Sequence, residues 1–331
     1  MKKVTVIGSG SWGTALAVML DKYGHDVTIW SWKEEEAQAI RDDHEHKEYL
    51  PGIEIKESIK IVTDPKEAIS GAEIVLSAIP SKFVRSSILN FAPFFNESQI
   101  IVNVAKGFED NTLLRLSEVI EECVPQCAVC TLVGPSHAEE VGRGVPTACV
   151  ISCKDMEVAK MVQNEFVNPT FRLYTNDDMI GMEVGAALKN VIALAAGISD
   201  GLGFGDNTKA ALMTRGITEI GRLGVAMGAK AETFAGLSGI GDLIVTCTSM
   251  HSRNRRAGIM LGEGKSLTET LDEVHMVVEG VHTAKAAYDL SIRYGIDMPI
   301  TGHINEVLFE GKTPKEAVLK LMLREQKSEI I

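Results

Sequence analysis

The chain has 331 residues, which at roughly 150 residues per domain predicts about two domains. Hydrophobic residues make up 45% of it and charged residues 24%, the values of a soluble globular protein, which excludes disordered and fibrous architectures. Lys and Arg number 33 against 45 Asp and Glu, and the resulting net charge of -12 argues against general binding of nucleic acid or anionic membranes.

Short apolar runs alternate with amphipathic stretches in the first half of the chain. The apolar runs are rich in β-branched residues and end in small or polar ones, which is typical of buried strands. They cover residues 2–10, 25–31, 72–81, 99–107 and 128–136, with 147–153 and 170–176 as candidates for further strands. The amphipathic stretches predict helices over 14–24, 33–43 and 111–124. This alternation predicts a parallel sheet with helices on both faces.

After about residue 177 the pattern becomes helical. Residues 177–201 form a long apolar stretch, and Asp177 or Asp178 can cap its amino end. Further helices are predicted over 208–229, 256–264, 282–295, 304–311 and 314–323. We therefore predict an α/β domain at 1–180 and an all-helical domain at 181–331.

Residues 8–13, GSGSWG, form a GxGxxG motif directly after the first predicted strand and directly before the first helix. In such a turn Gly8 permits the tight bend, Gly10 lets the backbone approach a pyrophosphate, and Gly13 lets the helix pack on the strand. The amino end of the helix then offers free N–H groups to the phosphates. The motif predicts a Rossmann-type, doubly wound sheet that binds a dinucleotide.

The tip of the second predicted strand bears on which dinucleotide is bound. In NAD-specific proteins this tip tends to carry Asp or Glu, which binds the adenosine ribose. Here it reads Ser31-Trp32-Lys33, and no carboxylate occupies it. Lys33 can pair with a 2′-phosphate while Trp32 covers the adenine; alternatively, Lys33 only begins a solvated helix, since three glutamates follow it. We expect NADP(H) to be favoured, with NAD(H) as the alternative.

Three more predicted strands end in small or polar residues where such sheets bind ligands. These ends are Pro80-Ser81, Lys106-Gly107 and residues 134–138. The ammonium of Lys106 is expected to emerge at this edge, although a surface lysine would have the same position. His137 is either a proton donor or the cap of the next helix.

Lys189 stands in an almost uncharged stretch, VGAALKNVIALAAG. On a helix its same-face neighbours are small or apolar and would leave open space above it: Gly185, Ala186, Ile192 and Ala193. No carboxylate lies one turn away to pair with it. A buried, unpaired lysine has a lowered pKa and is suited to proton transfer, although a lysine at the helix edge can instead reach solvent.

Two features follow in the helical half. Asp242 lies in a glycine-rich, otherwise apolar stretch, and residues 252–256, SRNRR, precede a short helix. Ser252 can cap that helix, which places Arg253 and Asn254 at its positive end and predicts an anion site for a substrate phosphate. The alternative for these arginines is a solvated face or a patch for an acidic partner.

The sequence also predicts a reducing compartment. Lys2 and Lys3 precede an apolar stretch as in a secretion signal, but glycines interrupt that stretch, so we expect a cytoplasmic protein. No uninterrupted apolar run reaches the ~18 residues of a membrane-spanning helix, so no membrane insertion is expected. We interpret the cysteines as core residues rather than metal or redox groups: Cys123, Cys127, Cys130, Cys149, Cys153 and Cys247.

Over essentially its whole length the chain resembles the bacterial NAD(P)-dependent glycerol-3-phosphate dehydrogenases. The motifs that carry the resemblance are GSGSWGTALA, the Lys106-Gly107 strand end, GPSHAEE, GAALKNVIALAAGISDGLGFGDNTKAAL, GLSGIGDLIVTCTSMHSRNRRAG and VVEG. The resemblance implies reduction of dihydroxyacetone phosphate to sn-glycerol 3-phosphate, which supplies phospholipid synthesis.

The resemblance also implies roles for individual residues, with Lys189 as the catalytic acid and base. The implied cofactor site comprises Gly8, Gly10, Ser11, Trp12, Gly13, Trp32, Lys33, Tyr49, Lys106, Ala138, Arg253, Val277 and Glu279. The implied substrate site comprises Lys106, Gly134, Ser136, Lys189, Asp242, Ser252, Arg253 and Asn254. No metal is implied.

Other interpretations remain at this point. A 3-hydroxyacid or another phosphosugar dehydrogenase would share this plan, as would a cofactor-sensing protein without activity. Trp32 departs from the small residue that this family more commonly places before the basic one, which affects the coenzyme assignment. A homodimer is compatible with the apolar helical half.

Overall fold

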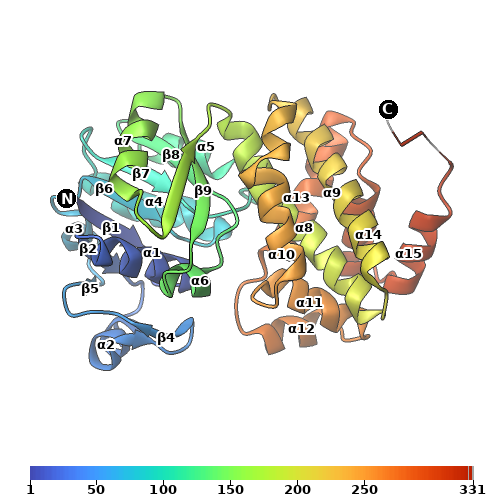
Figure 1. Cartoon of the computed structure of the whole chain (residues 1–331), viewed down its shortest axis with the longest axis horizontal. Coiled ribbons are helices and arrows are strands. Elements are labelled where there is room, and N and C mark those ends of the chain that lie inside the picture. Colours follow the sequence, from blue (N-terminus) through green and yellow to red (C-terminus); the bar gives the residue numbers. More distant parts are fainter. Residues whose placement is uncertain (327, 330–331) are drawn as a thin grey trace.

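The structure is a computed structural model that describes residues 1–326 and 328–329. Two parts lie side by side in Figure 1, a sheet with its helices and a group of helices that includes α8, α9 and α13. The strands end at Thr175, and the long helix that opens the helical part begins at Met179. A division at 180/181 stays our proposal, and the predicted end at 331 lies outside the described residues.

The sheet has eight strands in the order β10-β9-β8-β7-β6-β1-β2-β5. After β1 the chain builds toward β2 and β5, then returns to place β6 on the other side of β1. The strand order therefore reverses between β1 and β6, and open α/β sheets bind their ligands at the carboxyl ends of strands at such a point. A separate hairpin pairs β3 with β4. The strands are β1 (Lys3–Ile7), β2 (Asp26–Trp30), β3 (Glu45–His46), β4 (Leu50–Glu54), β5 (Lys60–Val62), β6 (Ile74–Ser77), β7 (Ile100–Asn103), β8 (Ala128–Val133), β9 (Thr147–Cys153) and β10 (Phe171–Thr175).

The predicted parallel pairing is confirmed for β1, β2, β6, β7 and β8, whereas β9, for which no direction was predicted, runs antiparallel to β8, with Cys130 opposite Cys153 and Val133 opposite Val150. A parallel return needs a crossover long enough to span the sheet. Between β8 and β9 the chain forms only the five-residue helix α6, which rises about 7.5 Å, so the chain turns back at the same edge. β10 then pairs parallel to β9.

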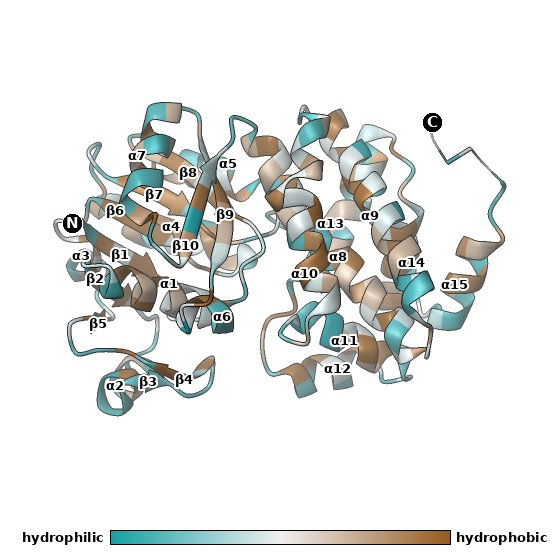
Figure 2. Cartoon of the chain, viewed as in Figure 1, coloured by the Kyte–Doolittle hydropathy of each residue, from teal (hydrophilic) through white to brown (hydrophobic). Residues whose placement is uncertain are grey.

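Helices cover both faces of the sheet, as predicted, because successive strand residues point to opposite sides. Val4 and Val6 of β1 pack with α1, α2, α6 and α7, whereas Ile7 packs with α3, α4 and α5. Figure 2 shows β1 in brown and most of α2 in teal. These helices are α1 (Ser11–Lys22), α2 (Glu34–Asp43), α3 (Pro65–Ile69), α4 (Val84–Phe91), α5 (Leu116–Cys123), α6 (Ala138–Gly142) and α7 (Met156–Phe166).

The helix predicted over 111–124 is shorter than expected, because α5 begins only at Leu116. The residues before it form a turn in which Thr112 donates to the Glu109 carboxylate at 2.6 Å. Leu113 has a positive φ of 62°, which is incompatible with a right-handed helix. A capping interaction of Glu118 with the Arg115 backbone starts the helix instead.

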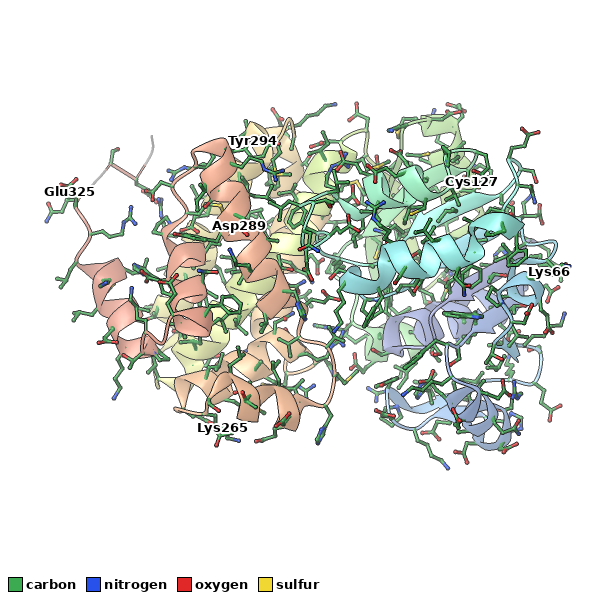
Figure 3. The ribbon with its side chains drawn as sticks, turned by 180° about the vertical axis from the view of Figure 1, so that it is seen from behind. Lys66, Cys127, Lys265, Asp289, Tyr294 and Glu325 are labelled. Atoms are coloured by element: carbon green, nitrogen blue, oxygen red, sulfur yellow. The ribbon has the colours of Figure 1, made fainter. Side chains whose placement is uncertain are left out.

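The helical part is built around α8, and Asp178 caps it by accepting from the Gly181 N–H. Contrary to our expectation that no stretch is long and apolar enough to cross a membrane, α8 has that length and hydropathy. Of its most apolar 18-residue stretch 94% is buried in the fold, which is the position of a core helix. The helices are α8 (Met179–Gly201), α9 (Asp206–Ala226), α10 (Asp242–Thr248), α11 (Arg253–Gly262), α12 (Leu267–Val274), α13 (Glu279–Tyr294), α14 (Pro299–Phe309) and α15 (Pro314–Met322). Figure 3, seen from behind, labels Asp289 and Tyr294 on α13.

Two pairs of glycines bring α8 and α11 into backbone contact. A Cβ at Gly258 would lie 2.9 Å from the Cα of Gly197, and a Cβ at Gly262 would lie 3.0 Å from the Cα of Gly201. The contacts follow in the same order along both helices, so α11 runs parallel to α8. Any side chain at these positions would push the helices apart.

Candidate active site

The glycine turn between β1 and α1 has the shape of a phosphate cradle. Gly8 has a φ of +116°, and a Cβ there would lie 2.7 Å from the carbonyl oxygen of Ala78. A Cβ at Gly13 would overlap the Gly8 carbonyl, so only glycine allows this approach of helix and strand. A Cβ at Gly10, in contrast, would meet no described atom within 4 Å. Open space above Gly10 and an amino end of α1 without a side-chain cap, where Ser11 and Trp12 begin the helix, fit a bound pyrophosphate.

The tip of β2 differs from its prediction. Trp32 is 68% exposed, and Lys33 Nζ lies 4.3 Å from the centre of its ring. We expected no carboxylate at this tip, but the Glu36 carboxylate reaches it from the first turn of α2 and accepts from the Ser31 hydroxyl at 2.7 Å. It also accepts from Ser9 in the glycine turn. This contact could not be predicted from the sequence, because it depends on how α2 folds back toward the end of β2.

At the boundary of the two parts, two lysines share one carboxylate. Lys189 on α8 donates to Oδ1 of Asp242 at 2.5 Å, and Lys106 after β7 donates to its Oδ2 at 2.7 Å. Lys106 also donates to the carbonyl oxygen of Gly134 after β8 at 3.1 Å. The Ser136 hydroxyl donates to the same carbonyl at 3.0 Å. Five predicted site residues from four elements thus form one cluster.

Lys189 is buried as predicted, but the prediction that it is unpaired was wrong. Its partner Asp242 lies 53 positions away in sequence, beyond the reach of helix spacing. Thr246 also contributes and was missed by the sequence analysis, although it lies one helical turn after Asp242. Its hydroxyl donates to the Asp242 backbone carbonyl, which leaves its oxygen to accept from Lys189 at 2.6 Å.

The space expected above Lys189 is partly filled. A Cβ at Gly185 would lie 2.7 Å from the carbonyl oxygen of Ser238, so the π-helical turn Leu237–Gly241 packs directly on α8. This turn leads without a break into α10, whose first residue is Asp242. Because residue 185 is glycine, the turn can pack against α8 and hold the Asp242 carboxylate beside Lys189.

Burial and charge act in opposite directions on this cluster. Burial lowers the pKa of Lys189 to about 8, although the Asp242 carboxylate raises it and the Lys106 ammonium lowers it further. Burial alone would raise the pKa of Asp242, but the two ammonium groups hold it below its usual range. Burial and the charge on Lys189 lower the pKa of His137, whose ring contacts the Val245 carbonyl. His137 is the residue before α6, but its side chain does not cap that helix.

The amino end of α11 forms an anion site. Ser252 caps the helix as predicted, since its hydroxyl accepts from the Arg255 N–H. Arg253 is the first helical residue, and burial lowers the pKa of its guanidinium, an effect opposed by the nearby Glu279 carboxylate. Among the residues that the structure describes, no side chain pairs with this guanidinium. A half-buried cation at a positive helix end, with no hydrogen-bond or ion-pair partner among the described residues, fits a phosphate or another anion.

Asn254 connects the anion site to the lysine cluster. Its amide donates to the Asn190 side chain at 2.9 Å, and its oxygen accepts from the Gly280 N–H at 2.8 Å. Asn190 directly follows Lys189 on α8, and it is a second residue that the sequence analysis missed. The contact places the amino end of α11 at the level of Lys189 along α8, so an anion there lies beside the proton donor.

The remaining predicted site residues lie outside the lysine cluster. Glu279 begins α13 and accepts from the Ser81 N–H at 3.2 Å and its hydroxyl at 2.6 Å, which ties the end of β6 to the helical part. Val277 precedes it and is half-buried, and Ala138 is buried at the start of α6. Tyr49 precedes β4. Burial raises the pKa of its phenol, the carboxylates of Glu48 and Glu36 raise it further, and the Arg253 guanidinium opposes them. No described contact joins Trp32, Lys33 or the glycine turn to the lysine cluster.

Five of the six cysteines are buried, and Cys123 is half-buried. All six are free thiols, and four of them, Cys127, Cys130, Cys149 and Cys153, are buried at or in β8 and β9. No group of three or more His, Cys, Asp and Glu side chains within the described residues could hold a metal ion.

Two family models match the chain. Residues 3–159 match the amino-terminal domain of NAD-dependent glycerol-3-phosphate dehydrogenase, and residues 178–319 match the carboxyl-terminal domain of the same family. Together they include the glycine turn, the lysine cluster and the anion site.

Individual proteins agree with the family models. A glycerol-3-phosphate dehydrogenase [NAD(P)+] of Fusobacterium nucleatum is 54% identical over 334 residues, covering 100% of this chain and 99% of the relative. A protein of the same name from Bacillus subtilis is 52% identical and covers 98% of this chain and 95% of the relative. The crystal structure of glycerol-3-phosphate dehydrogenase from Coxiella burnetii superposes with a TM-score of 0.94 at 36% identity, covering 98% of this chain and 99% of that one. The fold, the site and these matches confirm the resemblance seen in the sequence: the chain belongs to the NAD-dependent glycerol-3-phosphate dehydrogenase family.

Proposed function

We propose that this chain reduces dihydroxyacetone phosphate to sn-glycerol 3-phosphate at the boundary of its two parts. The observation that carries the proposal is the position of Lys189 beside the amino end of α11. Lys189, with a pKa of about 8, and the half-buried Arg253, which has no ion-pair partner among the described residues, lie at one level along α8, linked through Asn190 and Asn254. A ketone that carries a phosphate needs both groups at once.

The protein supplies the proton and the electrostatic field for this reaction. When bound, the reduced nicotinamide coenzyme donates the hydride to the carbonyl carbon. Lys189 gives its proton to the carbonyl oxygen and becomes a neutral amine that keeps its contacts with Asp242 and Thr246. Lys106, whose ammonium pairs with Asp242 at 2.7 Å, stabilises the negative charge that develops on the oxygen. Arg253, with the N–H groups of α11, holds the phosphate.

The finer assignments belong to the same proposal. The ammonium of Lys33 over Trp32 supports a preference for NADP(H), with NAD(H) also accepted. The free thiols support a cytoplasmic location, where the product would supply glycerophospholipid synthesis. A homodimer also stays a proposal, which sedimentation of the purified chain would test.

Initial rates of NADPH oxidation test the proposed reaction. We expect rapid turnover with dihydroxyacetone phosphate and little with a 3-keto acid, because only the phosphate fits the anion site at α11. The same assay with NADH gives the coenzyme ratio. Tight NADPH binding without turnover would instead favour a cofactor-sensing protein.

The pH profile is expected to reverse with the direction of the reaction. Reduction needs the protonated form of Lys189, so kcat/KM for dihydroxyacetone phosphate should fall as pH rises through about 8, approaching tenfold per pH unit. Oxidation of glycerol 3-phosphate needs the neutral amine, so its kcat/KM should rise through the same range. Asp242 stays charged and His137 neutral there, because both have lowered pKa values. If kcat/KM changed with pH in the same direction for reduction and for oxidation, the role of Lys189 would be contradicted.

A further inference from the structure

The Glu36 carboxylate is an unusual group for the place it occupies. Its side chain is only 16% exposed, and it lies between two loops that the fold brings to the carboxyl ends of β1 and β2. Ser9 donates to it from the glycine turn and Ser31 donates to it from the strand tip. A Rossmann-type fold binds the adenosine ribose between these two loops. Glu36 therefore lies where the coenzyme's ribose is read, although it belongs to α2 rather than to the strand.

The two oxygens of this carboxylate are not equivalent. Both serine hydroxyls donate to Oε1, and the Nε2 of His46 lies 3.8 Å from the same oxygen. Among the described residues no hydrogen bond reaches Oε2. Oε1 thus fixes the orientation of the side chain, while Oε2 remains available to accept a hydrogen bond from a ligand hydroxyl.

The carboxylate is also charged over the whole working range of pH. Burial alone raises the pKa of Glu36, but the imidazole of His46 and the hydroxyls of Ser9 and Ser31 outweigh burial and lower that pKa to about 2. A fixed negative charge at this place attracts a hydroxyl donor and repels a phosphate.

We infer that Glu36 is the residue that restrains NADP(H) binding in this chain: it accepts a hydrogen bond from the ribose diol of NAD(H) and repels the 2′-phosphate of NADP(H). Lys33, two residues after Ser31 at the tip of β2, acts in the opposite direction. The coenzyme preference is then the balance between one exposed cation and one fixed anion. This inference rests on the proposed function only for the identity of the coenzyme.

The test replaces Glu36 with glutamine and measures binding of coenzyme fragments by calorimetry, without any turnover. Glutamine keeps an acceptor for Ser9 and Ser31 but removes the charge, so the fold should be kept, which thermal unfolding checks. We expect the Kd of 2′,5′-ADP to fall by about tenfold or more and the Kd of ADP to rise a few-fold, because like charges in contact are strongly unfavourable. The Kd values of NADPH and NADH should change in the same two directions.

Glu35→Gln is the matched control, since Glu35 is the exposed neighbour with the same charge. Equal changes in Glu35→Gln and Glu36→Gln would overturn the inference, because a general charge effect would then explain both. No change in the ratio of the two Kd values would overturn it as well. If the unaltered chain did not turn over dihydroxyacetone phosphate, only the proposed function would be refuted, since the fragment titrations need no substrate.

Discussion

Replacing Lys189 with methionine is expected to lower kcat for dihydroxyacetone phosphate reduction by about 10²–10⁴-fold and to change KM by no more than a few-fold. The loss is expected because burial lowers the pKa of Lys189 to about 8, which suits this group to give its proton to the substrate oxygen. Steady-state kinetics at pH 7 measure both parameters. Methionine has nearly the length of lysine and keeps the packing of α8.

The fold should survive this change. Asp242 keeps its ion pair with Lys106 at 2.7 Å, so no buried carboxylate is left alone. Lys230→Met is the matched control, because Lys230 is exposed and its ion-pair partner in the described part of the chain is the exposed Asp177. If Lys189→Met and Lys230→Met turned over equally fast, Lys189 would have no part in the chemistry.

Replacing Arg253 with alanine is expected to raise KM for dihydroxyacetone phosphate by about 30- to 1,000-fold, with a smaller effect on kcat. Removing one member of a desolvated charge pair costs about 2–5 kcal/mol, and this range corresponds to the lower part of that cost. Arg253 has no described protein partner, so the loss should fall on ligand binding rather than on folding. Substrate titrations at saturating NADPH measure the change.

Two controls separate the phosphate from other effects. Unphosphorylated dihydroxyacetone should be reduced equally slowly by the variant and the unaltered chain, since it offers nothing for Arg253 to bind. Arg293 lies in the last turn of α13, beside Tyr294, which Figure 3 labels, and at the other end of that helix from Glu279. Arg293→Ala removes the same charge there and should leave KM unchanged. A parallel loss with both substrates would show that Arg253 acts on something other than the phosphate.

The features that could be predicted from sequence are those set by neighbours along the chain. The glycine turn, the alternating strands and the cap at Ser252 depend on residues within a few positions of one another, so local pattern was enough. Helices α3, α4, α7, α10 and α12 were not predicted. For α3 and α10 the reason is that five to seven residues, or a glycine-rich start, give too little periodicity. The antiparallel direction of β9 was not predicted, because strand direction depends on the length of the connection and leaves no mark in the strand itself.

The contacts within the site could be predicted only in part. The burial of Lys189 follows from its uncharged surroundings, but its pairing with Asp242 depends on how α10 packs on α8. The position of Glu36 depends in the same way on the turn between β2 and α2. Side chains that meet through tertiary packing are the ones for which spacing along the sequence carries no information.

The backbone contact between α8 and α11 limits the length of molecule that this site can hold. The four glycines leave no room for one helix to slide along the other, so the separation between the ammonium of Lys189 and the amino end of α11 is set by main chain and not by side-chain volume. A ligand must bridge that separation with its own carbon skeleton. Substitutions elsewhere in the helical core can therefore change the stability of the fold without changing the length of ligand that the site accepts, as long as these glycines remain.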